Sequence, residues 1–269
     1  MQKKKIWIIL GIVLAVCMIA GAVIFWAVYD KPETPNQNTN VGEDGSDDGT
    51  QYEMIEEGDV IFLEIGQSVK IASGSACVCD KPAVASVGAD GVVTALTAGE
   101  ATVTSEIDDR TVTYTVLVNK SVTKESYQAP ETEETALAFA KNSVKAGEYT
   151  AVSLHLENCE GLSAFSIGLT YDSEALTLKA ASGVGGTDSV QFTDDGNGNV
   201  KLVGISHSVN GIGEGGIVTL YFMANEGAKV GNYDLTLSMG ESDMLVAVAH
   251  NDEITVDAKL YGASIEIKN

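Results

Sequence analysis

Three glycines have the spacing of a dinucleotide-binding loop. Gly211, Gly213 and Gly216 match the GxGxxG pattern, whose backbone can approach a pyrophosphate closely. In dinucleotide-binding proteins this loop leads into a helix, whereas here it leads into the Val/Leu/Tyr-rich run 217–222. We therefore expect a flexible loop at this position and no nucleotide site.

A second segment begins like a calcium-binding loop. Asp195, Asn197 and Asn199 stand at alternate positions, as the first oxygen ligands of such a loop do. However, the sixth position is Val200 where the loop needs glycine, and the twelfth is Ser206 where it needs glutamate. The segment is therefore expected to form a hairpin turn.

The histidines and cysteines lack the spacing of a catalytic or metal site. His155, His207 and His250 are far apart in the sequence, and neither an HExxH motif nor a GxSxG nucleophile elbow occurs. Cys77 and Cys79 are two positions apart, which on a strand does not allow an unstrained disulfide. The sequence has no CxxC pair, so a zinc site is not expected. We expect no enzymatic activity, no intrinsic cofactor or metal, and buried free thiols.

The charge of the chain excludes several classes of ligand. The 269 residues include 38 acidic and 16 basic side chains, which gives a formal net charge of −22. Nucleic-acid binding needs clustered cations, and Arg110 is the single arginine, so neither nucleic acid nor arginine-based phosphate binding is expected. A well-solvated exterior explains this acidity better than a store of cations.

An apolar segment near the N-terminus predicts a membrane anchor. Residues 6–29 carry no charge and would rise about 36 Å as a helix, enough to cross a bilayer. Trp7 and Trp26 lie near its two ends, and three lysines precede it. This pattern places residues 1–5 in the cytoplasm and the rest of the chain outside. A cleaved signal peptide is the alternative, although its apolar region is usually only about 7–15 residues long.

Two polar segments divide the remaining chain into two β-rich blocks. Residues 30–57 include the run GEDGSDDG and are expected to form an acidic disordered linker, and residues 119–134 form a second linker. The blocks, 58–118 and 135–269, consist of short alternating runs rich in Val, Ile, Thr and Leu. Examples are 101–106, 111–118 and 151–157. Outside the predicted membrane helix we therefore expect an all-β fold.

Three motifs mark the first block. They are GQSVKI at 66–71, DKPAVASV at 80–87 and GVVTALTAGEATVT at 91–104. These motifs resemble the bacterial immunoglobulin-like group 2 domain, which occurs in surface adhesins and as a spacer in exported proteins. The resemblance implies an immunoglobulin-like β-sandwich that serves as a stalk or an adhesive module. Family members usually have an aromatic residue ahead of the Asp-x-Pro, where this chain has Cys77 and Cys79, so that corner of the core is expected to pack differently.

Four motifs mark the second block. They are SVKAGE at 143–148, GLSAFSIGLTYDSEAL at 161–176, DDGNGNVKL at 194–202 and GGIVTLYF at 215–222. They resemble the cohesin domain. The resemblance implies a nine-stranded jelly-roll β-sandwich that binds a dockerin, a small module with paired calcium-binding loops, and so docks an enzyme onto a scaffold. Calcium would belong to the dockerin, and the cohesin itself would do no chemistry.

The resemblance also implies where a dockerin would bind, on a flat face formed largely by the third, fifth, sixth and eighth strands. Alternation along residues 162–171 points Phe165, Ile167, Leu169 and Tyr171 to the core and leaves outward Ala164, Ser166, Gly168 and Thr170. Alternation along residues 200–207 leaves inward Val200 and Leu202, and outward Lys201, Val203, Ile205 and His207. The opposite register, with Val203 and Ile205 in the core, stays open. Members of the family's first type usually have an acidic residue near the position of Ser166, so a departure from their specificity is expected.

Together these features predict a membrane-anchored cohesin at a bacterial cell surface. It would bind dockerin-bearing enzymes or scaffolds in a cellulosome-type assembly, and would contact polysaccharide only indirectly. A surface adhesin or carbohydrate-binding β-sandwich is the alternative, but sugar binding usually employs exposed aromatic rings, and no tryptophan follows Trp26. A structural envelope protein whose sandwich has no partner is the third possibility.

Overall fold

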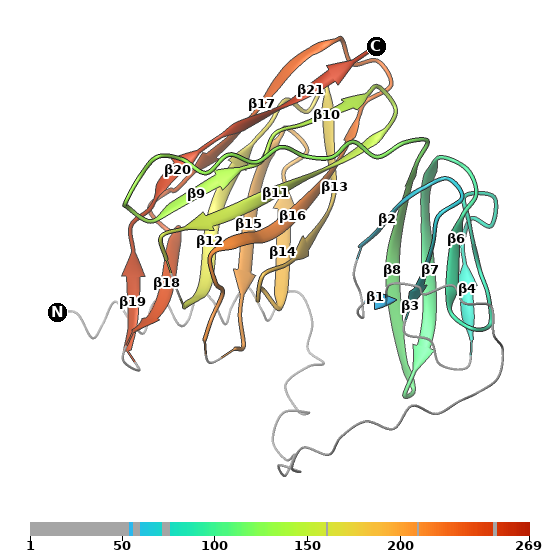
Figure 1. The fold of residues 1–269 in the computed structure, drawn as a ribbon, viewed down its shortest axis with the longest axis horizontal. Helices are drawn as coiled ribbons and strands as arrows, with labels where there is room; N and C mark the ends of the chain where they lie inside the picture. Colours follow the sequence, from blue (N-terminus) through green and yellow to red (C-terminus); the bar gives the residue numbers. More distant parts are fainter. Residues whose placement is uncertain (1–53, 56–59, 72–75, 160, 209, 250–251) are drawn as a thin grey trace. The chain divides into compact units, whose positions relative to one another are not determined.

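The structure is a computed structural model that describes residues 54–55, 60–71, 76–159, 161–208, 210–249 and 252–269. All regular elements in these ranges are strands, which confirms the all-β prediction for this part of the chain (Figure 1). A search of the same ranges finds no helix with the length and hydropathy of a membrane span. The predicted span at residues 6–29 lies outside the described residues, as does most of the predicted linker at 30–57.

The first sandwich consists of two four-stranded sheets. One has the order β1 (Met54–Ile55), β3 (Ser68–Ile71), β6 (Val92–Ala95) and β5 (Ala85–Val87). The other has the order β2 (Val60–Glu64), β8 (Arg110–Asn119), β7 (Gly99–Ile107) and β4 (Cys77–Cys79). Alternate residues of these strands, such as Ile61, Val93 and Tyr114, are fully buried in a common core. The assignment of this sandwich to the bacterial immunoglobulin-like family stays a prediction.

The three cysteines of the described chain are free. Cys159 is buried, as predicted, but Cys77 and Cys79 are only half-buried. They lie on β4, which is an edge strand paired with β7 alone, so the thiols pack against the core and keep partial access to solvent. Cys77 Sγ lies 3.5 Å from the hydroxyl of Ser105. The expectation of buried thiols was therefore wrong for these two residues.

The second sandwich packs a five-stranded sheet against an eight-stranded sheet. The five-stranded sheet has the order β13 (Leu176–Gly183), β16 (Gly215–Ala224), β11 (Tyr149–Glu157), β9 (Ala136–Phe139) and β20 (Lys259–Tyr261). The other has the order β10 (Asn142–Lys145), β21 (Ala263–Lys268), β17 (Gly231–Ser238), β12 (Leu162–Thr170), β15 (Asn199–Ile205) and β14 (Ser189–Asp194). Its two further strands are β18 (Met244–Ala249), which also pairs with β12, and β19 (Asp252–Val256), which pairs with β18 (Figure 1).

The sequence predicted nine strands for this sandwich, and the described residues form thirteen, β9 to β21. At both ends of the sandwich the chain changes from one sheet to the other, so that β9 pairs with β20 and β10 with β21, both in parallel. The β17–β18 run is interrupted at residues 239–243, and both of its strands pair with β12. The additional strand β19 returns from β18 as a hairpin.

The register between β12 and β15 depends on a glycine. Phe165 of β12 pairs with Gly204 of β15, and the Phe165 ring is 1% exposed. A Cβ atom at position 204 would lie 2.2 Å from Cζ of that ring, so any larger residue would collide with it. Gly204 therefore faces the core, and its neighbours Val203 and Ile205 face outward because successive side chains of a strand alternate.

The segment 123–135, here called the strap, lies along the outer side of β11. The Glu125 carboxylate accepts hydrogen bonds from the backbone nitrogen of Ser153 at 2.8 Å and from its hydroxyl at 2.7 Å. The Tyr127 ring stacks on the imidazole of His155, with centroids 3.5 Å apart and planes 7° from parallel. The strap thus covers part of the outer face of the five-stranded sheet.

Candidate functional site

The candidate site is the outer face of the eight-stranded sheet where β14, β15, β12 and the β17–β18 run lie next to one another. Directly paired residues of antiparallel strands point to the same side of a sheet, so the pairing defines three outward rows. The rows are Ser189, Ile205, Ala164 and Val246; Gln191, Val203, Ser166 and Met244; and Thr193, Lys201, Gly168 and Ser238. We call this surface the open face.

The structure brings six of the seven residues predicted for the site together in these rows. Ala164, Ser166 and Gly168 are half-buried on β12, and Lys201 is half-buried on β15. The β15 side chains of Val203 and Ile205 are 38% and 37% exposed. The seventh residue, His207, is exposed two positions beyond the end of β15. Of the two registers that the sequence allowed, the structure has the one with Val203 and Ile205 outward.

Small residues keep the open face flat along β12. Gly168 pairs with Ser238 of β17, and a Cβ atom at position 168 would lie 2.4 Å from the Ser238 hydroxyl. Ala164 and Ser166 add little height beside the two aliphatic side chains of β15. A partner surface can therefore approach the backbone of β12 closely.

The interruption between β17 and β18 contributes Asp243, which the sequence pattern did not predict. Its carboxylate forms an ion pair with the Lys201 ammonium and accepts hydrogen bonds from the Ser166 hydroxyl at 3.2 Å and the Gly240 amide at 2.8 Å. The Asp243 side chain is 7% exposed and that of Lys201 40%. Partial burial lowers the pKa of Lys201, which means that its ammonium is less well solvated than in open water.

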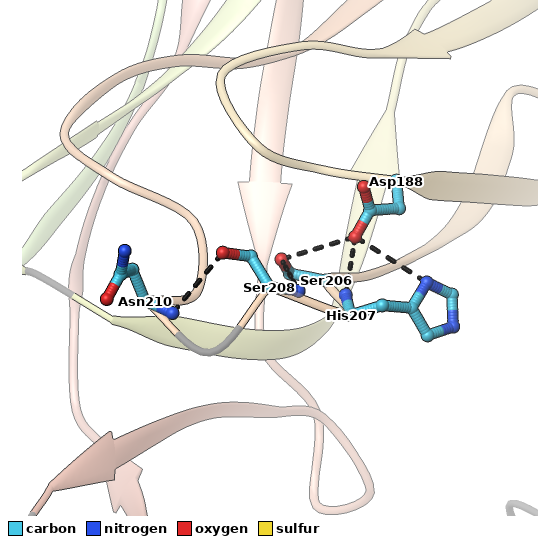
Figure 2. A network of polar contacts seen from close by, with 5 residues as sticks. All are labelled: Asp188, Ser206, His207, Ser208 and Asn210. Atoms are coloured by element: carbon cyan, nitrogen blue, oxygen red, sulfur yellow. Dashed lines mark hydrogen bonds and ion pairs between the residues drawn. The ribbon is translucent and has the colours of Figure 1, made fainter. Parts of the chain in front are cut away.

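A second polar cluster fixes the end of β15 (Figure 2). The Asp188 carboxylate accepts a hydrogen bond from the backbone nitrogen of His207, and it lies 3.4 Å from the Ser206 hydroxyl and 3.5 Å from His207 Nδ1. The chain then continues in two turns of the same kind, in which the Ser206 hydroxyl accepts from the Ser208 amide and the Ser208 hydroxyl from the Asn210 amide. These contacts hold His207 at the edge of the open face.

The second cluster contains the residue types of a Ser-His-Asp triad but not its order of contacts. In such a triad the serine hydroxyl contacts the histidine, which in turn contacts the aspartate. Here the Ser206 hydroxyl contacts Asp188 directly, while His207 contacts Asp188 through Nδ1. Within the described ranges no group of three His, Cys, Asp or Glu side chains is arranged to hold a metal ion. The contacts of this cluster are therefore not those of a Ser-His-Asp triad.

The charges of the open face are balanced, in contrast to those of the whole chain. Among the residues of the three rows, Lys201 alone has an ionisable side chain, and Asp243 matches its charge. The chain as a whole has a formal charge of −22. A nearly neutral surface with exposed aliphatic side chains is typical of a protein-binding site.

The comparisons with solved structures find cohesin domains that align with the C-terminal half of the chain. A type I cohesin from Pseudobacteroides cellulosolvens has 19% identity and a TM-score of 0.45, covering 50% of this chain and 92% of its own. The cohesin of a cohesin–dockerin complex from Clostridium thermocellum has 15% identity and a TM-score of 0.45, covering 50% and 99%. A non-cellulosomal cohesin from Archaeoglobus fulgidus has 19% identity and a TM-score of 0.42, covering 51% and 92%. No protein-family profile and no curated protein matches the chain.

Proposed function

We propose that this protein is a membrane-anchored cohesin of a bacterial cell surface and that its open face binds dockerins. It would attach polysaccharide-degrading enzymes or scaffolds to the cell. The observation that carries the proposal is the flat, charge-balanced surface on which Val203 and Ile205 stand exposed beside Ala164 and Ser166. The anchor is proposed from the uncharged segment 6–29 and its lysine-rich flank.

The shape and charge of the open face both suit a dockerin. Exposed aliphatic side chains next to small residues offer apolar area that a partner can cover without a cavity. Calcium-binding loops are built from carboxylates, so a dockerin brings acidic groups close to its partner. A charge-balanced face on an acidic chain reduces the repulsion that such a module would otherwise meet.

The cohesin-like motifs supply the support beneath this face. Leu169 and Tyr171 of the LTYD motif are buried in the core. The Tyr171 hydroxyl donates a hydrogen bond to the Asp194 carboxylate, which ties the end of β12 to the β14–β15 hairpin. Burial and this contact raise the pKa of Tyr171 to about 12, so the phenol stays protonated and able to donate. The motif residues therefore hold together the three strands that would contact a dockerin.

Calcium should matter to the partner alone in this proposal. We expect no cofactor on the cohesin, whereas the dockerin needs its calcium-binding loops filled in order to fold. Binding should therefore be lost in the presence of a chelator and return when calcium is added back.

The test is a binding assay between the full-length chain, solubilised in detergent, and recombinant dockerins. The panel would include dockerins from the same bacterium, and each would be measured with calcium and with a chelator. We expect calcium-dependent binding that is lost in Ile205→Asp. Val184→Asp is the matched control, since Val184 is also 38% exposed but lies beside the five-stranded sheet, where its backbone nitrogen donates a hydrogen bond to the Ile217 carbonyl.

Two outcomes would contradict the proposal. If no dockerin binds, or if Val184→Asp and Ile205→Asp weaken binding equally, the open face is not a dockerin site. A positive glycan array without dockerin binding would support the adhesin or carbohydrate-binding alternative. The anchor has its own test, because the chain should remain with the membrane fraction after washing with high salt, and its C-terminal half should be accessible to protease on whole cells.

A further inference from the structure

An ion pair lies within the open face among uncharged neighbours. Lys201 extends from β15 and is paired with Asp243 from the interruption between β17 and β18. Val203 lies two residues farther along β15 on the same side, a separation of about 7 Å along the strand. A partner that covers Val203 must therefore also cover the ion pair.

Covering this pair removes water from both charges. An isolated ammonium or carboxylate loses its hydration at a large cost when a partner docks, whereas paired charges compensate each other. Asp243 is already largely removed from water at 7% exposure, and two further donors, Ser166 and Gly240, hold its carboxylate. The carboxylate is thus fixed in place before any partner arrives, and Lys201 is the more exposed member of the pair.

We propose that Asp243 is a specificity-determining residue of the open face. Its carboxylate neutralises Lys201, and the face therefore selects dockerins whose contact surface carries no charge opposite this ion pair. This inference rests on the proposed function. A dockerin with a carboxylate opposite the pair would meet the fixed charge of Asp243, and Lys201 could not serve both carboxylates equally well. Without the Asp243 charge, Lys201 is free to pair with the partner, and the preference should reverse.

The test compares Asp243→Asn, Lys201→Met and the double variant with the wild type, all as full-length chains in detergent. Each replacement keeps the approximate shape, and Asn can still accept the hydrogen bond from Gly240. The probes are one dockerin that the wild type binds, together with forms of it in which a single contact residue is changed to Asp. Lys259→Met is the control. Lys259 lies on β20, in the other sheet, and forms an exposed ion pair with Glu134.

We expect Asp243→Asn to weaken binding of the unmodified dockerin at least tenfold and to favour an Asp-containing form over it. The double variant should return to within threefold of the wild type, because neither charge then remains unpaired. Melting temperatures would show that each variant is folded. The control should leave all affinities within twofold.

Three outcomes would overturn the inference. If the double variant binds as weakly as Asp243→Asn, the aspartate acts by shaping the loop and not through its charge. If Asp243→Asn binds all probes like the wild type, the ion pair does not select partners. In both cases the wild type still binds dockerin, so the proposed function stands. If the wild type binds no dockerin, the proposed function and this inference fall together.

Discussion

The two outer faces of the second sandwich differ in their contacts, although both arise from the same alternation of side chains. The strap covers part of one face, and the other is left open. On β11 the outward residues Ser153 and His155 are covered by Glu125 and Tyr127 of the strap. On β15, Val203 points outward as well, but it remains 38% exposed. The covered face has polar and aromatic side chains that the strap contacts, although His155 Nε2 is buried without a hydrogen-bond partner, whereas the open face leaves aliphatic side chains exposed.

This difference separates residues that stabilise the fold from residues that are available to a partner. The contacts of the covered face are made when the chain folds, so their loss should appear in the free energy of unfolding. Val203 and Ile205 of the open face keep more than a third of their surface in water, so their replacement should cost the free protein less than replacement of a fully buried residue. Their contribution should appear only in binding.

The largest expected effect is on binding, at Ile205. Replacing this side chain with Asp puts a charge where apolar contact is needed, and dockerin affinity should fall at least about 100-fold, equivalent to about 2.7 kcal/mol. The free energy of unfolding should change by about 1 kcal/mol or less, because the side chain is partly buried but 37% exposed. Calorimetric titration and urea unfolding of the same samples check both values. A large loss of stability would contradict the distinction between the two faces.

Gly204, next to Ile205, should show the opposite behaviour: its replacement should affect the free energy of unfolding, by an amount comparable to the loss of binding energy at Ile205. Gly204→Ala adds a Cβ atom 2.2 Å from the Phe165 ring, which is 1% exposed and has little room to move. We expect a loss of about 2 kcal/mol in unfolding free energy, as is common for an overpacked core. The double variant Gly204→Ala/Phe165→Leu should recover part of this loss. If Gly204→Ala is neutral, the assigned register between β12 and β15 is wrong.

On the covered face we expect a smaller loss of stability, at Glu125. Glu125→Ala removes the two hydrogen bonds to Ser153 and should lower the unfolding free energy by about 1.5 kcal/mol. Dockerin affinity should not change, because the strap and the open face belong to different sheets. Glu133→Ala is the matched control, as this glutamate is exposed on the same segment. Equal effects of the two variants in urea unfolding would show that the strap contacts do not stabilise the sandwich.

The strands of this sandwich could be predicted from the sequence because they depend on local pattern. Alternation identified Phe165, Ile167 and Leu169 as core residues, and all three are buried. The register of β15 could not be decided in this way, since both of its faces carry aliphatic side chains. It depends on the pairing of Gly204 with Phe165, a contact between strands that only the fold brings together.

The contacts that were missed involve polar residues distant in the sequence. Asp243 and Ser166 are 77 positions apart, and the aspartate reaches the open face because the β17–β18 run is interrupted there. The strap has the polar composition of a linker, and its role depends on individual contacts such as the Tyr127–His155 stack. Composition and periodicity carry no information about such pairs.

The smallest expected effect is a pH dependence that belongs to the covered face. Burial lowers the pKa of His155 and outweighs the attraction of Glu125 and Glu157 for its proton. The unfolded chain therefore takes up a proton near the ordinary histidine pKa of about 6.5 before the folded chain does, so stability should fall as the pH drops below that value. Because the residue is only partly buried, we expect a loss below about 1 kcal/mol between pH 7 and pH 5.

Urea unfolding at several pH values checks this last expectation, with His155→Gln as the comparison. Glutamine cannot take up a proton in this range, so the variant should lose this part of the pH dependence, whatever its stability at pH 7. If the wild type and His155→Gln lose stability in parallel on acidification, the histidine under Tyr127 does not titrate differently in the folded and unfolded chains. Dockerin affinity should not follow the pH dependence of stability, because the strap and the open face are on different sheets. If the affinity does depend on pH and His155→Gln abolishes this dependence, the two faces are coupled.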